Sequence, residues 1–145
     1  MSSVAVMELV IAWPAANRAV VAAVEKAAEL GIAINVAVAD PAGRLAAFLR
    51  MPGAFNESIS IAIDKAKTAA GFGFATDVWK EALAGNRLLE LGIACRPGVV
   101  AFGGGLPITD AQGRVIGGIG VSGGSEEQDI ICASAGLEAV LAKET

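Results

Sequence analysis

One apolar segment of the chain, RVIGGIGVSGGSEEQD, is rich in glycine and contains the motif G-x-G-x-x-G at residues 118–123. In a dinucleotide-binding loop such glycines follow the end of a strand, and the next helix leads to a second parallel strand. Here the apolar run continues through Gly120 to Val121, and a single helix follows. We therefore predict no nucleotide site. Gly117, Gly118 and Gly120 are instead strand positions that admit close approach of another backbone, side chain or ligand.

Two predicted hairpins share the turn spelling D-x-x-G-R. The segments INVAVAD and RLAAFLRM are joined by Asp40–Gly43, and LPIT and RVIGGIGV are joined by Asp110–Gly113. Asp at the first and Gly at the fourth position fit a type I turn followed by a bulge.

Apolar residues at helical spacing predict helices over residues 14–30, 56–72, 76–86 and 125 to about 143. Pro14 suits a first turn and Gly31 a helix end. Thr76 is a candidate N-cap, and Ser125 with Gln128 spells a capping box. The order helix, hairpin, two helices, hairpin, helix predicts an α+β fold. Because no linker or low-complexity segment divides it, we expect one domain spanning residues 1–145.

Composition narrows the function classes. The chain is 54% hydrophobic and 18% charged, an apolar excess that predicts a homo-oligomer. Charges interrupt every apolar run before the roughly 18 residues of a membrane span. The first residues include Glu8 and lack the basic region of a signal peptide, so we expect no membrane association and a cytoplasmic location. A net charge of −4 and the lack of tyrosine argue against nucleic-acid binding.

Histidine is absent from all 145 residues. Ordinary zinc sites and nucleophilic triads are therefore excluded, and we expect no metal. Cys95 and Cys132 are far apart in sequence, and we expect both to be buried as small apolar residues.

The segment FGGGLPITDAQGRVIGGIGVSGGSEEQD, with SISIAIDKAKTAAGFGFAT and AVADPAGRLAAFLRMPGA before it, resembles the GlcG/HbpS-like family. This family includes glycolate-operon proteins, extracellular haem-binding proteins and the C-terminal domain of a cobalamin adenosyltransferase. The resemblance covers about Pro14 to Leu141. It implies a profilin-like α/β/α sandwich with a central antiparallel sheet, and an oligomer commonly built from dimers. It also implies haem or another planar molecule in an apolar pocket near a subunit contact.

The sequence departs from haem-binding members of that family because it offers no histidine ligand to iron. The remaining candidate ligands are Cys95, Cys132, Met51 and Thr109. Cys95 is the better thiol candidate because Arg96 lies beside it. We expect no cofactor, with haem admitted only through the resemblance.

Lys65 and Glu127 are the candidate catalytic residues. Lys65 is either a surface lysine paired with Asp64 or Glu57, or a partly buried lysine whose lowered pKa suits a base or a carboxylate anchor. Glu127 belongs to an acidic segment that either favours the dipole of the last helix or places a carboxylate beside the lysine for proton transfer.

Seven further residues are candidate ligand contacts. Two arginines beside loops are suited to bind a carboxylate, and an asparagine either caps its helix or contacts a ligand. Three consecutive glycines beside a phenylalanine are suited to form a flat wall for a planar ligand. They are Arg50, Asn56, Arg96, Phe102, Gly103, Gly104 and Gly105.

Two functions remain open. The absence of histidine favours a cofactor-independent enzyme of isomerase, lyase or hydrolase type acting on a small carboxylated metabolite. The alternative is a non-catalytic haem- or small-molecule-binding accessory protein of a catabolic operon.

Overall fold

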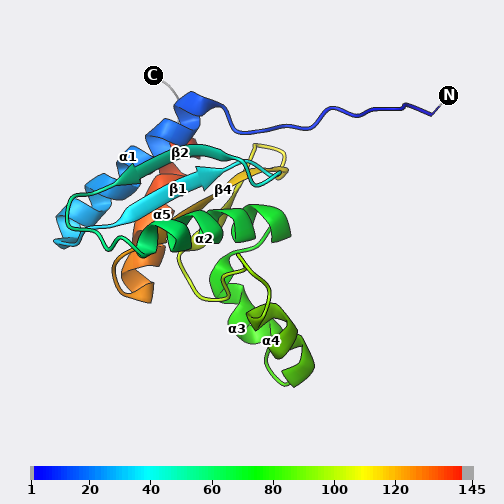
Figure 1. Cartoon of the computed structure of the whole chain (residues 1–145). Helices are drawn as coiled ribbons and strands as arrows, with labels where there is room; N and C mark the ends of the chain where they lie inside the picture. Colours follow the sequence, from blue (N-terminus) through cyan, green and yellow to red (C-terminus); the bar gives the residue numbers. More distant parts are fainter. Residues whose placement is uncertain (1, 142–145) are drawn as a thin grey trace.

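A four-stranded antiparallel sheet of order β2-β1-β4-β3 forms the centre of the computed structural model, which describes residues 2–141. Helices α1 and α5 pack together on one face, and α2 covers the other (Figure 1). The predicted α+β sandwich is thus confirmed. The elements are α1 Trp13–Leu30, β1 Asn35–Ala39, β2 Leu45–Arg50, α2 Ser58–Phe72, the 3-10 turn η1 Thr76–Val78, α3 Trp79–Ala82, α4 Arg87–Ala94, β3 Gly105–Thr109, β4 Val115–Ser122 and α5 Glu126–Leu141.

Local signals in the sequence account for most boundaries. Helix α1 has proline in its first turn and ends at Gly31, which is left-handed at φ 72°. Before α5, the Ser125 N–H donates to Gln128 Oε1 at 2.9 Å, and the Gln128 N–H donates to Ser125 Oγ at 3.2 Å, so the predicted capping box is confirmed. The predicted end of α5 near residue 143 lies outside the described residues.

The two D-x-x-G-R turns are built alike. Asp40 Oδ1 accepts the N–H of Ala42 and of Arg44, and Asp110 Oδ1 accepts the N–H of Gln112 and of Arg114. Each turn is accompanied by a register shift in its hairpin, as the sequence predicts. Because β1 and β4 are neighbouring antiparallel strands, both turns lie at the same end of the sheet.

The segment between α2 and β3 differs from the prediction. In place of one helix over 76–86, it contains η1, α3 and an additional helix, α4, and it projects from the sandwich (Figure 1). Asn86, predicted to close a helix, instead opens α4, because its side chain accepts the Leu89 N–H at 3.0 Å. Thr76 does not cap a helix, because its hydroxyl binds the backbone of Gly105.

The core has two unequal parts. Between the sheet and α1 and α5 lie larger side chains, including Val36, Val38, Ile119 and Val121. Between the sheet and α2 the fully buried apolar side chains are small, Ala37, Ala39, Ala62 and Ala66, and the larger Phe48 and Ile63 are only partly buried against them. Within the described part of the chain, every helix is too short or too polar to cross a membrane.

The glycines of β4 let α2 lie directly on the strand. A Cβ at Gly120 would stand 2.1 Å from the Ala62 carbonyl oxygen and 2.4 Å from the Ala66 nitrogen. At Gly118 it would stand 2.4 Å from the Ala66 carbonyl oxygen. The predicted close approach of another backbone is confirmed, and the approaching backbone is that of α2.

Gly120→Ala should therefore lower the free energy of unfolding, because the added methyl group meets rigid helix backbone. We expect a loss at or above the upper end of the roughly 1–3 kcal/mol typical of overpacked cores. Gly71→Ala is the matched control, since a Cβ there meets nothing within 4 Å and alanine favours a helix. Urea unfolding measures both, and equal stability of the two variants would contradict the close packing.

Candidate functional site

Lys65 is buried at the point where α2, β4 and α5 meet. Its side chain is 1% exposed, and its Nζ donates to the Val121 carbonyl oxygen at 2.7 Å and to Asp129 Oδ2 at 3.1 Å. Helical spacing puts Lys65 on the same face of α2 as Ala62 and Ala66, which points at β4. The pairing with Asp64 or Glu57 that a surface lysine would make is therefore wrong.

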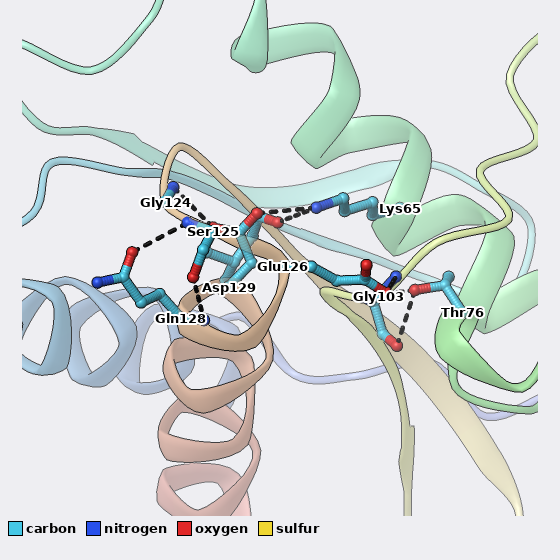
Figure 2. Close-up of polar contacts among 10 residues, drawn as sticks. Lys65, Thr76, Gly103, Gly124, Ser125, Glu126, Gln128 and Asp129 are labelled. Atoms are coloured by element: carbon cyan, nitrogen blue, oxygen red, sulfur yellow. Dashed lines mark hydrogen bonds and ion pairs between the residues drawn. The ribbon is translucent and has the colours of Figure 1, made fainter.

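Asp129 is the carboxylate partner of this lysine. Its Oδ1 accepts the Gly124 N–H at 2.9 Å, so both carboxylate oxygens are engaged (Figure 2). Burial lowers the pKa of Lys65, and the attraction of Asp129 opposes this effect. Burial likewise raises the pKa of Asp129, and the attraction of Lys65 opposes it. Of the two alternatives for Lys65, the buried lysine with a lowered pKa agrees with this environment.

The third ammonium proton of Lys65 has the ring of Phe102 as its neighbour. Nζ lies 5.1 Å from the ring centroid, within the range of a cation–π contact. An ammonium group has three donors, and a carbonyl, a carboxylate and an aromatic ring now surround them. Lys65 therefore joins three elements and the loop that precedes β3, and it presents no free donor to solvent.

Each of the three glycines before and at the start of β3 makes room for protein groups. A Cβ at Gly103 would stand 2.6 Å from Ile130 Cδ1, one at Gly104 2.6 Å from Lys65 Nζ, and one at Gly105 2.6 Å from the Lys65 carbonyl oxygen. All three glycines are buried. The expected flat wall for a ligand is therefore occupied by this chain's own side chains and backbone.

Two side chains fix this glycine loop from outside it. Glu126 Oε1 accepts the Gly103 N–H at 2.9 Å, and Thr76 Oγ1 accepts the Gly105 N–H at 2.9 Å (Figure 2). Phe102, next to Gly103, is 49% exposed.

A hollow of about 390 Å³ opens beside Phe102, between the projecting helices and the start of α5. Its lining combines apolar groups with three carboxylates and one ammonium group. The lining residues are Asp77, Lys80, Leu83, Ala84, Glu90, Ala101, Phe102 and Glu126. The surroundings of the exposed ring are therefore apolar and acidic.

Glu127 is not beside Lys65. It is exposed and lines another hollow, of about 400 Å³, with Ile130 and Ile131. Successive helix positions are about 100° apart, so Glu127 cannot share the buried face that carries Asp129. The pairing of Lys65 with Glu127 is wrong, and the carboxylate partner is Asp129.

The arginines and the asparagine do not gather around Phe102. Arg50 is exposed, and its guanidinium donates to the Ala54 carbonyl oxygen at 2.9 Å. Asn56 and Arg96 are also exposed, and none of the three lines the hollow beside Phe102. Of the seven predicted ligand contacts, Phe102 is the one that lines it.

Sequence reasoning missed Thr76 and the central role of Asp129. A signal for Asp129 was present, because Asp129, Cys132, Ala133 and Gly136 recur at helical spacing, and all four are buried. Thr76 carried no such signal, since a threonine before a helical segment also fits an N-cap.

The two cysteines differ in environment. Cys132 is buried as expected, and burial raises the pKa of its thiol to about 11. Cys95 is exposed at the end of α4, so its expected burial is wrong. Among residues 2–141, no group of three His, Cys, Asp or Glu side chains is placed to hold a metal ion.

Lys65→Met should reduce the free energy of unfolding by roughly 3–5 kcal/mol, because it leaves the Asp129 carboxylate buried without its cation. Lys65→Met/Asp129→Asn should recover part of this loss. Lys67→Met, two residues away and exposed, should change the free energy of unfolding by less than about 0.5 kcal/mol. Urea unfolding of the four proteins tests whether Lys65 and Asp129 act as a unit.

The pH dependence of Lys65→Met has a defined sign. Its Asp129 loses the cation that lowers its pKa, so the folded pKa rises further above 3.8. A carboxyl group whose pKa is higher in the folded than in the unfolded state stabilises the folded state fully below the unfolded pKa. Its contribution to the free energy of unfolding is lost as the pH rises through the folded pKa. The difference in free energy of unfolding between wild type and Lys65→Met should therefore grow from pH 4 to pH 7. A deficit that shrinks over this range would contradict the assignment.

Comparison with known proteins gives a consistent result. The family described as "Haem degrading protein HbpS-like" matches residues 11–138. A 15.0 kDa protein from the dhaT-dhaS intergenic region of Citrobacter freundii is 36% identical, over 88% of this chain and 90% of its own. Corrinoid adenosyltransferase PduO of Salmonella typhimurium is 37% identical over 82% of this chain, which spans about a third (35%) of PduO.

Solved structures agree with the sequence matches. The crystal structure of Klebsiella pneumoniae protein ORFY is 31% identical, with a TM-score of 0.89 over 99% of both chains. A PduOC:heme complex is 33% identical, with a TM-score of 0.82 over 90% of this chain and 95% of its own. A double mutant of HbpS from Streptomyces reticuli is 33% identical, with a TM-score of 0.86 over 99% of this chain and 94% of its own. On the family match and these relatives, the chain belongs to the HbpS-like family.

Proposed function

We propose that this protein is a non-catalytic binding protein for a planar, largely apolar small molecule, which stacks on the exposed face of Phe102. The observation that carries the proposal is the state of Lys65. The candidate base is 1% exposed and donates to Val121 and Asp129, so its role is to hold the site together. The half-exposed ring of Phe102 beside a hollow of about 390 Å³ offers a binding surface.

This arrangement of residues gives little support to a catalytic function. Proton transfer needs a group within hydrogen-bond reach of the substrate, and Lys65 lies behind Phe102 with its donors engaged. Glu127, its expected partner, lies on another face. The comparisons likewise support the binding alternative, since a structural relative is a heme complex.

The residues around Phe102 do not fit haem held through its iron. No histidine exists in the chain, and the hollow is lined by no cysteine or methionine. Cys132 is buried, with a thiol pKa of about 11, and Met51 Sδ accepts the Ile34 N–H at 3.3 Å. Three carboxylates against one lysine also oppose an acidic ligand. The geometry therefore favours a neutral or cationic planar ligand over the small carboxylate expected from the sequence, and haem should bind weakly, through its macrocycle.

Phe102→Ala should weaken binding of proflavine, a planar cationic probe, about tenfold, since a stacked ring pair contributes up to about 1.5 kcal/mol. Fluorescence titration measures this. Phe55→Ala is the control, because Phe55 is also exposed and does not line the hollow. Haemin, which carries two carboxylates, should bind more weakly than this cationic probe. A sharp low-spin haemin spectrum at one haem per chain, unchanged in Phe102→Ala, would overturn the proposal.

We also propose that the protein self-associates. Many large apolar side chains are exposed on the single chain, among them Leu88, Leu89 and Leu91 of α4 and Ile131 of α5. A soluble monomer rarely leaves so much apolar surface uncovered. Light scattering at micromolar concentration should give a mass of at least twice 14.5 kDa. A single 14.5 kDa species would contradict this proposal and leave the ligand proposal standing.

A further inference from the structure

The first residues of the chain form an extended arm that leaves the sandwich. This N-terminal arm, residues 2–10, contains no helix or strand, and Figure 1 shows it running away from the body. It is fixed at its root, where Ile11 enters the core and its N–H donates to the Ile116 carbonyl oxygen at 2.9 Å. The arm therefore starts from a defined point, beside the end of β4 where the sheet turns lie.

The side chains of the arm are apolar and uncovered. Val6 is 82% exposed and Met7 is 99% exposed, and Val4, Leu9 and Val10 are exposed as well. The only charged residue of the arm is Glu8. An extended apolar segment that makes so few contacts with its own chain gains stability only by packing against another molecule.

A hollow lies at the root of the arm, between the arm and the two sheet turns. It measures about 350 Å³ and is lined by Met7, Glu8 and Leu9 of the arm and by Pro41, Ala42, Arg114 and Val115 at the two turns. Arg114 binds Asp110 and still has 61% of its side chain exposed. Its guanidinium can therefore also meet the carboxylate that a second arm carries.

A second copy of this chain suits the arm better than a different protein does. A standard interface takes about 20–30 residues a side, and a nine-residue arm alone falls well short of that. Reciprocal exchange about a twofold axis uses each arm and each hollow once, so one association buries both.

We propose that the N-terminal arm docks on a second copy of the chain, each arm lying across the partner's hollow at the two turns, with the partner's Glu8 near Arg114. This inference rests on the proposed self-association and identifies a segment that produces it. The arm and the Phe102 hollow share no residue, so the two sites can be altered separately.

Light scattering of three proteins at matched micromolar concentration tests the arm. Deletion of residues 2–9, and separately Val6→Asp/Met7→Asp, should at least halve the mass of the wild-type assembly. Both changes lie outside the core, so far-UV circular dichroism and the urea midpoint should stay close to those of wild type. Ser60→Asp, at an exposed polar position of α2, is the control that adds a charge away from the arm and away from the apolar surface of α4, and it should keep the wild-type mass.

The outcomes separate the two proposals. If wild type is a 14.5 kDa monomer, self-association and arm docking are both wrong. If wild type is an oligomer and the folded arm variants keep its mass, arm docking alone is wrong. If the arm variants fall to a smaller mass while remaining folded, the arm is a subunit contact.

Discussion

The close approach of α2 to β4 is the constraint on which the rest of this structure depends. Only glycine at positions 118 and 120 allows the helix backbone to lie on the strand, because any Cβ would meet Ala62 or Ala66. A lysine side chain from such a helix cannot run out to solvent past the sheet. Lys65 therefore reaches along the strand to the Val121 carbonyl oxygen and to Asp129. Burial of that charge follows from the backbone packing, and the carboxylate on α5 compensates for it.

Much of the fold could be predicted from the sequence, because its signals are local. The Asp110–Gly113 turn and the Ser125–Gln128 capping box each need only neighbouring residues, and the structure forms both. Local signals failed between α2 and β3. There Asn86 begins helix α4, although the sequence predicts that a helix ends at this residue. Thr76 binds the distant backbone of Gly105. The choice between these roles depends on tertiary contacts that no short window contains.

The candidate site was predictable only in part, for the same reason. Lys65 and Phe102 could be singled out, but whether the lysine faced solvent depended on the depth at which α2 packs. The three glycines at residues 103–105 show the difficulty most clearly. A triple glycine before a strand fits both a ligand wall and a tightly packed loop. The packed loop forms because the side chains of Ile130, Lys65 and Thr76 occupy the space beside these glycines. A glycine pattern reports that something lies close, and it does not identify what.

The same distinction bears on the relation between this chain and its structural relatives, one of which is a heme complex. What the chain shares with them is the sandwich, with TM-scores of 0.82 to the PduOC:heme complex and 0.86 to HbpS. A shared scaffold fixes where a hollow can form, whereas its lining decides what enters. Around Phe102 that lining is apolar and acidic, with Asp77, Glu90 and Glu126 opposed by Lys80 alone. On the proposed binding function, like charges repel a carboxylated ligand and no histidine is present to hold iron, so we expect this lining to set the ligand preference.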